Sequence, residues 1–475
     1  MKKIKFGTSG WRAIISEDFT FANVRLVVQA IADYIKTEHK KKRIKSKSVV
    51  IGYDTRFLSK EFAEVAATVL SANNIKVFLC DRDAPTPVIA YQIIRKRCAG
   101  GINFTASHNP PHYNGIKFSS QIGGPATLDI TRTIENNIKK LQRIKKVKEY
   151  KENKKLVAFF DPSPEYLKQV ERVVDLKAIK KARLKIVCDC LYGTSRGYLD
   201  NILAKQGCKR IILHDFLNPY FGGRRPEPAE ENIHELISTV KKAKFNLGLA
   251  TDGDADRFGI VDADGTYITP NQVITLLFYH LLRSREQKRE SFVARTVATT
   301  HMVDIIAKAN GVKVVETPVG FKYFVESIQS GNCIIAGEES GGLSLSGHVP
   351  EKDGIVACLL VAEMVAKEKR PIAQILHSVY KKYGRLYSHR IDLDITEEKK
   401  LFLMRRLVSG PIKRLGSQKI TKRDTLDGCR FFLEDESWVL FRPSGTEPIV
   451  RVYFESRSKK ILKAIEQACV RLIPG

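Results

Sequence analysis

A serine and a histidine stand side by side in a loop built from turn-forming residues. The segment 105–110 reads Thr-Ala-Ser-His-Asn-Pro and follows an apolar run, Ala99 to Phe104, that predicts a short buried strand. Loops at strand ends often carry catalytic groups, so Ser107, with His108 beside it, is a candidate nucleophile. Ser-His neighbours also occur in ordinary turns, and only further polar clusters downstream favour chemistry over that alternative.

Three aspartates alternate with small residues in the segment 252–257, which reads Asp-Gly-Asp-Ala-Asp-Arg. In a near-extended loop Asp252, Asp254 and Asp256 point the same way, and their charges repel unless a cation lies among them. All-oxygen ligands favour a hard ion, and the segment lacks the closing Glu of an EF-hand loop, so we predict a Mg²⁺ site. The alternative is a solvated acidic turn, against which Arg257 and the apolar runs on both sides argue.

The next acidic segment, 262–266, reads Asp-Ala-Asp-Gly-Thr and is open to two interpretations. It looks like the nucleophile motif of haloacid-dehalogenase-type phosphatases, in which Asp262 would attack phosphorus. Asp-Gly is also a strong hairpin signal, and strand-like residues flank the segment on both sides. We therefore predict a hairpin turn here.

Two further clusters have the composition of a sugar site and a phosphate site. The segment 337–342 reads Gly-Glu-Glu-Ser-Gly-Gly, in which Glu338 and Ser340 can bind hydroxyl groups. The segment 442–448 reads Arg-Pro-Ser-Gly-Thr-Glu-Pro, in which an arginine, two hydroxyls and backbone amides can cradle a phosphate. Either segment taken alone could be an ordinary turn.

Together the four clusters resemble those of the α-D-phosphohexomutases, which include phosphoglucomutases and phosphomannomutases. The resemblance begins at 6–12, Phe-Gly-Thr-Ser-Gly-Trp-Arg, keeps the order of the loops and covers nearly the whole chain. It implies an isomerase that interconverts hexose 1-phosphate and hexose 6-phosphate. It also implies Mg²⁺, a phosphoserine, a bound 1,6-bisphosphate intermediate and glucose 1,6-bisphosphate as activator.

The resemblance implies a role for each matching residue. Ser107 carries the phosphoryl group, and an oxygen of the phosphoserine completes the Mg²⁺ shell of the three aspartates. The basic residues implied around the reaction centre are Arg12, His108, Lys117 and Arg257. The residues implied to bind the substrate are Lys322, Glu338, Ser340, Arg442, Ser444, Gly445 and Thr446.

The same chemistry follows from the residue types. A phosphoryl group that moves between two sugar oxygens needs a temporary carrier, and a serine oxygen serves if cations offset the charge. The attacking sugar hydroxyl must lose a proton, for which His108 and Lys117 are the candidates. Lys117 would need a lowered pKa to act as a base, which Arg12 could supply.

Two positions in the sugar loop bear on which sugar is used. Gly342 stands where many family members that accept both mannose and glucose have His, and Glu339 stands where glucosamine-specific members typically have Gln. With the Gly-Phe-Lys sequence that ends at Lys322, the resemblance favours glucose phosphates. Mannose phosphates, or dual specificity, are the alternative, and pentose phosphates are a more remote one.

Strand patterns alternate with helix patterns along the chain, as in Val49–Tyr53, Ser59–Ala72 and Lys76–Cys80. This predicts the α/β class. The resemblance implies three similar α/β domains with mixed sheets plus a smaller C-terminal α+β domain, with the active site in the central cleft. The predicted domains are 1–150 with the phosphoserine loop, 151–264 with the metal-binding loop, 265–371 with the sugar-binding loop and 372–475 with the phosphate-binding loop. A hinge before the last domain would let that loop close on the substrate and exclude water.

The composition fits a large enzyme of a reducing compartment. The chain has 475 residues, 43% of them hydrophobic, and no apolar stretch near the roughly 18 residues that span a bilayer. Its nine cysteines include no CxxC pair, and its basic start lacks the apolar core of a secretory signal. We therefore expect a cytoplasmic protein with mostly buried thiols, a monomer or homodimer that does not bind membranes.

The charge is the least explained feature. Lys and Arg number 80 against 52 Asp and Glu, a formal net charge of +28. An anionic substrate needs only a few of these charges, and runs such as Lys36 to Lys47 and Lys139 to Lys155 are typical of solvated helix faces or linkers. No nucleic-acid-binding module is recognisable, so no specific nucleic acid partner is predicted. The rival from another class is a non-catalytic relative that binds a polyanion through its basic surface.

Overall fold

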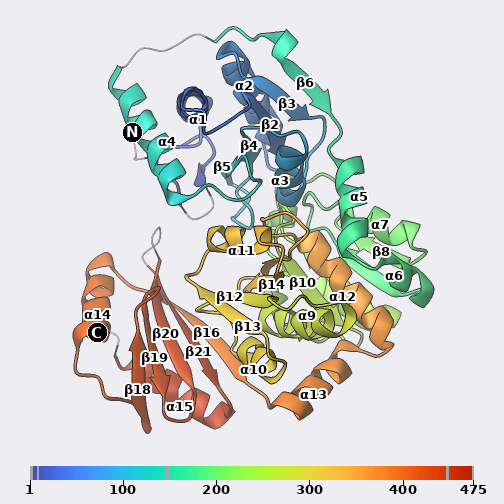
Figure 1. Cartoon of the computed structure of the whole chain (residues 1–475), viewed down its shortest axis with the longest axis vertical. Coiled ribbons are helices and arrows are strands. Elements are labelled where there is room, and N and C mark those ends of the chain that lie inside the picture. The colour runs from blue at the N-terminus through green and yellow to red at the C-terminus, as the bar shows by residue number, and fades with distance from the viewer. Residues whose placement is uncertain (1–3, 8–9, 145–149, 445–448, 473–475) are drawn as a thin grey trace.

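The computed structural model describes residues 4–7, 10–144, 150–444 and 449–472. Three α/β units and one antiparallel unit follow one another along the chain and surround the middle of the molecule (Figure 1). The predicted fold class, three α/β domains with mixed sheets plus a smaller C-terminal domain, is therefore confirmed.

The first unit is built on a mixed six-stranded sheet in the order β1-β5-β4-β2-β3-β6. The β2 strand pairs in parallel with β3 and β4, while β5 runs antiparallel to β4 and β1. The strands are β1 (Trp11–Ile14), β2 (Ser48–Tyr53), β3 (Lys76–Cys80), β4 (Gly100–Phe104), β5 (Tyr113–Ser120) and β6 (Val157–Phe160). The helices are α1 (Phe21–Lys40), α2 (Ser59–Ala72), α3 (Thr86–Arg95) and α4 (Leu128–Ile144).

The edge strand β6 lies beyond the predicted boundary at residue 150. It pairs in parallel with β3, from Val77 opposite Val157 to Cys80 opposite Phe160, so the first sheet extends into the range assigned to the second unit. Sequence pattern alone does not reveal this, because a four-residue edge strand carries almost no periodic signal.

The second unit has a five-stranded sheet in the order β11-β10-β9-β7-β8. Its strands are β7 (Lys185–Asp189), β8 (Lys209–Leu213), β9 (Leu247–Thr251), β10 (Phe258–Asp262) and β11 (Tyr267–Ile268). Its helices are α5 (Ser163–Val173), α6 (Leu176–Ala182), α7 (Leu199–Lys205) and α8 (His234–Ala243). The antiparallel β9 and β10 hold the aspartate loop between them.

The third unit has a four-stranded sheet in the order β13-β12-β14-β15. Its strands are β12 (Phe292–Thr296), β13 (Lys313–Thr317), β14 (Cys333–Glu338) and β15 (Gly342–Ser344). Its helices are α9 (Pro270–Ser284), α10 (Met302–Ala309), α11 (Val325–Gln329), α12 (Gly354–Glu368) and α13 (Ile372–Tyr383).

Helix α12 packs against both the second and the third units, and helix α13 packs within the third. Residues 354–366 of α12 are all buried, and the helix packs on α6, β9 and β10 as well as on α9, so one hydrophobic core spans both units. Helix α13 packs on α9 and α10 through buried residues such as Ile372 and Val379. Because of that packing, α13 lies in the third unit although its residues were predicted to begin the fourth.

The fourth unit is an antiparallel six-stranded sheet in the order β16-β21-β20-β19-β18-β17. Its strands are β16 (Tyr387–Asp394), β17 (Arg414–Leu415), β18 (Gln418–Asp424), β19 (Cys429–Leu433), β20 (Trp438–Pro443) and β21 (Ile449–Ser456). Its helices are α14 (Glu397–Ser409) and α15 (Lys459–Val470), which cover the buried face of the sheet.

Two expectations about composition can be compared with the structure. All nine cysteines are free and buried, as predicted. Within the described ranges, no helix combines the length and the apolar character needed to cross a bilayer.

Candidate active site

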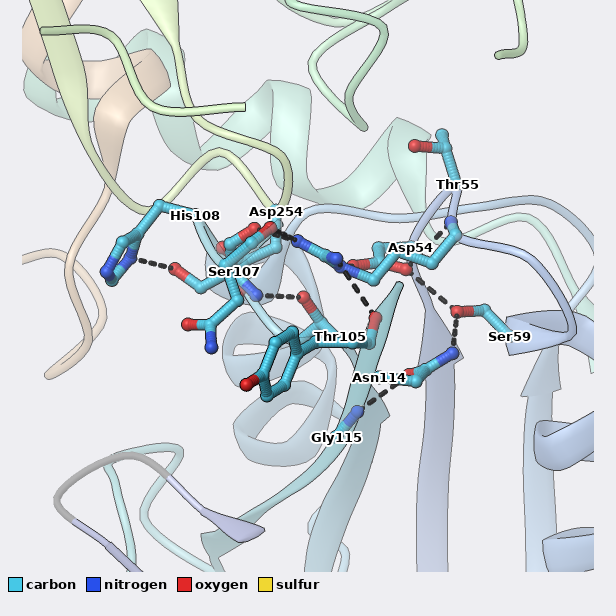
Figure 2. Close-up of polar contacts among 12 residues, drawn as sticks. Asp54, Thr55, Ser59, Thr105, Ser107, His108, Asn114, Gly115 and Asp254 are labelled. Carbon is cyan, nitrogen blue, oxygen red and sulfur yellow. Dashed lines mark hydrogen bonds and ion pairs between the residues drawn. The ribbon is translucent and has the colours of Figure 1, made fainter. Parts of the chain in front are cut away.

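Ser107 lies in the turn between β4 and β5 in a left-handed backbone conformation with φ of 53°. Its N–H donates to Thr105 Oγ1 over 2.9 Å, and its hydroxyl donates to Asp252 Oδ2 over 2.8 Å. The Nδ1 atom of His108 lies 3.3 Å from Ser107 Oγ (Figure 2). The serine loop of the first unit and the aspartate loop of the second therefore meet, and Ser107 is only 2% exposed there.

The three aspartates form a buried acidic cluster. Asp252, Asp254 and Asp256 are at most 1% exposed, and one carboxylate oxygen from each lies within 4.8 Å of the others. The Oδ1 atoms of Asp254 and Asp256 are buried without a hydrogen-bond partner in the described part of the chain. Burial and the two neighbouring carboxylates raise the pKa of Asp252 well above its ordinary value. Buried, partly unpaired carboxylate oxygens are the donors a hard divalent cation uses, so the cluster fits Mg²⁺.

Lys117 on β5 balances two of these charges. Its Nζ donates to Asp254 Oδ2 over 2.6 Å and to Asp256 Oδ2 over 2.8 Å. Burial lowers the pKa of Lys117, but Asp254 and Asp256 outweigh burial and Arg12, and the pKa is raised above its ordinary value. The lowered pKa that a base at this position would need is therefore not found, because the nearest groups are carboxylates. In this structure the Lys117 ammonium group is held between two carboxylates.

The other basic residues surround Ser107. Arg12 donates through NH1 to Asn109 Oδ1 over 2.7 Å, and Arg257 donates through NH1 to Glu227 Oε1 over 3.0 Å. Burial, Arg257 and Arg12 lower the pKa of His108 well below its ordinary value. At neutral pH the imidazole is therefore uncharged and can exchange a proton with a neighbouring hydroxyl.

The sugar loop, residues 337–342, lies where β14 turns into β15. Glu338 accepts the Gly320 N–H on Oε1 over 3.0 Å and the Ser340 hydroxyl on Oε2 over 3.3 Å. Glu339 points elsewhere, and its Oε1 accepts from Arg390 NH1 of β16 over 3.3 Å. The two acidic residues of the loop thus have different partners, and Glu339 contacts the fourth unit through Arg390.

The last glycine of the sugar loop is packed against a lysine. A Cβ atom added at Gly342 would overlap the side-chain Cδ of Lys352. The Lys352 Nζ in turn lies 3.2 Å from Asp256 Oδ2. Gly342 therefore leaves room for a lysine stem that reaches from the sugar loop to the aspartate cluster.

The phosphate loop is described as far as Ser444, and the predicted residues Gly445 and Thr446 lie outside the described residues. Arg442 donates through Nε to Asp427 Oδ2 over 2.8 Å, and the same oxygen accepts the Val319 N–H over 2.8 Å. Burial and Arg442 lower the pKa of Lys322, although Asp427 opposes them. Asp427 thus connects the arginine of the fourth unit with the Lys322 loop of the third.

The predicted site residues that the structure describes fall into two groups on different units. One comprises Arg12, Ser107, His108, Lys117, Asp252, Asp254, Asp256 and Arg257, which lie in direct contact or in an unbroken chain of contacts. The other comprises Lys322, Glu338, Ser340, Arg442 and Ser444 on the third and fourth units. A cavity between the first and third units is lined by Lys117 from the first group and Lys322 from the second.

Several residues in these contacts were not predicted. Thr86 donates its hydroxyl to Asp254 Oδ2, Lys352 contacts Asp256, and Asp427 pairs with Arg442. None of them stands in a recognisable motif. A fourth residue, Arg56, donates to the Ser107 carbonyl and stands three positions after the predicted strand Val49–Tyr53. Polar residues near the carboxyl end of a parallel strand are a signal that could have found it.

The acidic segment 262–266 is a hairpin, as predicted. Its flanking strands β10 and β11 pair antiparallel, and the Asp262 N–H donates to the Thr266 carbonyl over 2.9 Å. The Asp262 side chain accepts the N–H groups of Ile372 and Ala373 over 2.9 and 2.7 Å. Its carboxylate therefore anchors the start of α13, which gives it a structural task.

Comparison with known proteins identifies the class of protein. Four family profiles of "Phosphoglucomutase/phosphomannomutase" match in order: alpha/beta/alpha domain I at 3–145, domain II at 164–265, domain III at 269–383 and the C-terminal domain at 395–472. The chain therefore belongs to the phosphoglucomutase/phosphomannomutase family, the α-D-phosphohexomutases, and is a phosphohexomutase.

Individual relatives match over nearly their full length but differ in name. A "Phosphoglucomutase" of Komagataeibacter xylinus is 32% identical over 98% of this chain and 90% of its own. A "Phosphoglucomutase/phosphomannomutase" of Thermococcus kodakarensis is 29% identical over 98% of both chains. A protein of Methanosphaera stadtmanae described as a phosphoglucosamine mutase is 32% identical over 97% of this chain and 96% of its own. Among solved structures, a protein of Thermus thermophilus described as a phosphomannomutase superposes with a TM-score of 0.86 at 30% identity, covering 100% of this chain and 99% of its own.

Proposed function

We propose that the protein interconverts glucose 1-phosphate and glucose 6-phosphate through a phosphorylated Ser107 and a bound glucose 1,6-bisphosphate. The observation that carries the proposal is the contact between Ser107 Oγ and Asp252 in a buried cluster of three aspartates. A hydroxyl held against a site for a divalent cation can carry a phosphoryl group. Glucose 1,6-bisphosphate would phosphorylate Ser107 and so act as the activator.

Asp252, Asp254 and Asp256 would hold Mg²⁺, which when bound would draw charge from the oxygens of the transferred phosphoryl group. Arg257 and Arg12 add positive charge near His108, the neighbour of Ser107. Lys117 keeps two of the carboxylates ionised and fixed in place. The protein thus supplies a preorganised cationic surround, which is the main requirement of phosphoryl transfer.

One proton must move in each half of the reaction. As the Ser107 Oγ–phosphorus bond breaks and a sugar oxygen takes the phosphoryl group, the sugar hydroxyl loses a proton and Ser107 Oγ gains one. His108 is uncharged and its Nδ1 lies 3.3 Å from Ser107 Oγ. We therefore assign proton exchange at the serine to His108 rather than to Lys117.

The bisphosphate must then turn over so that its other phosphate faces Ser107. Glu338 and Ser340 would bind sugar hydroxyls in both orientations, while Lys322, Arg442 and Ser444, with Gly445 and Thr446, would bind the phosphate that does not react. Arginine and lysine suit this task because they bind phosphate through charge as well as hydrogen bonds.

Two contacts support glucose over the other hexoses. Glu339 is paired with Arg390, so the 2-ammonium group of glucosamine phosphate would have to compete with that arginine for the carboxylate. Gly342 is covered by the stem of Lys352, so a larger residue in its place would have to displace that lysine. Mannose phosphates are the second candidate, because they differ only in the orientation of the C2 hydroxyl and a relative over 98% of the chain is a "Phosphoglucomutase/phosphomannomutase".

The test is turnover of glucose 1-phosphate, mannose 1-phosphate and glucosamine 1-phosphate with Mg²⁺ and a trace of the matching 1,6-bisphosphate. We expect glucose to give the highest kcat/KM, and Ser107→Ala or chelation to abolish turnover. Phosphatase activity that survives Ser107→Ala would instead favour the hydrolase that uses Asp262. The absence of turnover with every sugar, together with tight polyanion binding, would favour the non-catalytic alternative.

A further inference from the structure

A buried arginine, Arg56, lies directly beneath the serine loop. It follows β2 in the chain, and its side chain and that of Asp54 are both 0% exposed. The Phe221 ring of the second unit lies 5.0 Å from its guanidinium carbon. The Arg56 side chain donates five hydrogen bonds.

Every nitrogen of the Arg56 guanidinium has a partner. NH2 donates to the Ser107 carbonyl over 2.6 Å and to the Asn109 carbonyl over 2.7 Å. NH1 donates to the Pro110 carbonyl over 2.8 Å and to the Tyr113 carbonyl over 3.0 Å. Nε donates to Asp54 Oδ2 over 3.1 Å. Four carbonyls of one loop thus converge on a single planar cation.

Asp54 holds this arginine through a second layer of contacts. Its Oδ1 accepts the Arg56 N–H over 3.0 Å and the Ser59 hydroxyl over 2.8 Å. Ser59 in turn accepts from Asn114 Nδ2 over 2.9 Å, and Asn114 Oδ1 accepts the Gly115 N–H over 2.8 Å (Figure 2). The network therefore runs from Asp54, before α2, to Gly115 in β5. The serine loop, residues 105–110, lies between these two residues in the chain.

The geometry gives the loop a fixed shape. Ser107 has a φ of 53°, which a residue other than glycine adopts only when its surroundings hold it there. With its carbonyl bound to Arg56 on one side, Ser107 directs Oγ to Asp252 on the other. A guanidinium is suited to such a task because its five N–H donors lie in a rigid plane, which an ammonium group cannot imitate.

We infer that Arg56, held by Asp54, is the positioning residue that fixes the left-handed Ser107 and the following loop in the orientation for phosphoryl transfer. Arg56 does not touch the substrate and takes no part in the bonds that change. This inference rests on the proposed mutase function, since it is the phosphoryl transfer that requires the orientation.

The test compares Arg56→Met with Arg285→Met. Arg285 pairs with the buried Glu363 far from the site and controls for the loss of an internal ion pair. For Arg56→Met we expect kcat to fall on the order of 100-fold, the penalty for misplacing a reacting group by about an ångström. KM should change little, because the groups that bind the sugar phosphate are untouched. Arg285→Met should lower Tm but leave kcat near the wild-type value.

Two further readouts separate positioning from general destabilisation. Amide hydrogen exchange in segment 105–113 should rise in Arg56→Met and not in Arg285→Met. Arg56→Lys keeps the charge but not the fork of donors, so its kcat should stay at least about tenfold below wild type. If Arg56→Met does not fold, Asp54→Asn keeps the guanidinium and should give a smaller loss of kcat with the same rise in exchange.

The inference would be overturned by a wild-type kcat in Arg56→Met or by full recovery of kcat in Arg56→Lys. A loss of kcat in Arg285→Met that matches its loss of Tm would also overturn it. An inactive wild-type enzyme would count against the proposed function alone, and the exchange measurement would still test whether Arg56 orders the loop.

Discussion

The two ends of the site are built in different ways. The reaction centre comprises Ser107 and the aspartate cluster, and the recognition end comprises the sugar loop and the fourth unit. At the reaction centre, the side chains of Lys117, Asp254 and Asp256 are 8%, 0% and 1% exposed and pair over 2.6 to 2.8 Å. At the recognition end, the pair between Arg390 and Glu339 spans 3.3 Å with side chains 42% and 20% exposed. Buried pairs at short distance hold a single geometry, whereas half-exposed pairs between domains form and break at little cost.

This difference matches what each end must do. In the proposed function, phosphoryl transfer to and from Ser107 takes place at one point, so the reaction centre gains from being fixed before the substrate arrives. The recognition end would have to accept the bisphosphate in two orientations, which favours contacts that can be remade. The comparison predicts that substitutions lose less activity as they move from the aspartate cluster towards the fourth unit.

The largest effect is expected for Asp254→Asn. It removes a carboxylate from the metal cluster and a partner from Lys117, so kcat should fall by about 10³-fold, corresponding to several kcal/mol of charge stabilisation. The rise in Tm on adding Mg²⁺ should also disappear. The control is Asp264→Asn at the exposed hairpin, which should leave both quantities unchanged. An Asp254→Asn protein that keeps its Mg²⁺-dependent Tm would show that the cation is held elsewhere.

A smaller loss is expected for Gly342→Ala. The added methyl group collides with the stem of Lys352, so the ammonium group must leave Asp256 and kcat/KM should fall on the order of tenfold. Because the effect acts through Lys352, Gly342→Ala should cost nothing further in a Lys352→Ala background, which lacks the stem that the methyl group meets. Additive losses in the double variant would mean that Gly342 acts directly on the sugar.

The pair at the recognition end should matter less and should affect KM. Arg390→Met and Glu339→Gln should each raise KM for glucose 1-phosphate, with a coupling of about 0.5–1 kcal/mol in a double-mutant cycle. The control pair, Arg457 and Glu436, lies within the fourth unit and should show no coupling in KM. A loss confined to kcat would contradict the division between the two ends.

The smallest effect is a pH dependence at the junction between the third and fourth units. Burial raises the pKa of Glu316, but Arg430 and Arg295 outweigh it and lower the pKa to about 2 from an ordinary value of 4.5. A lowered pKa means that the pair stabilises the protein above pH 4.5 and that this stability is lost as the pH falls towards 2. Glu316→Gln should therefore lower Tm at neutral pH, and its Tm difference from wild type should shrink in acid.

Glu351, near the reaction centre, should behave in the opposite way. Burial raises its pKa to about 7, although Lys352 and Lys117 oppose the rise. Its contribution to stability is therefore complete below pH 4.5 and is lost as the pH rises through 7. Relative to wild type, Glu351→Gln should therefore gain in Tm as the pH rises from 4.5 through 7. If the Tm differences of Glu316→Gln and Glu351→Gln from wild type changed with pH in the same direction, the contrast between the two carboxylates would be wrong.

Local features of the fold could be predicted from sequence because they depend on nearby residues. Helix α2 has the predicted bounds Ser59–Ala72, and the hairpin at 262–266 forms where Asp-Gly stands between two strands. The three aspartates could be grouped because they lie within five residues of one another in the chain. Periodicity and turn chemistry contain this information directly.

Contacts between distant segments could not be predicted in the same way. Lys117 is separated from Asp254 by 137 positions, and only the folded chain shows that two carboxylates raise its pKa. The partner of Arg56 is a loop 51 to 57 residues away, recognised through carbonyl groups that every residue possesses. The burial of α12 between two units likewise depends on packing rather than on its own sequence.

The central claim is that Ser107 passes a phosphoryl group between two positions of one sugar, and a chase of labelled enzyme tests it most directly. Protein carrying ³²P on Ser107 would be mixed with unlabelled glucose 1-phosphate and Mg²⁺, and the products separated. We predict that the label leaves Ser107 and appears in glucose 1,6-bisphosphate and glucose 6-phosphate. Release of the label as inorganic phosphate, or its retention on Ser107 while glucose 6-phosphate accumulates, would contradict the account.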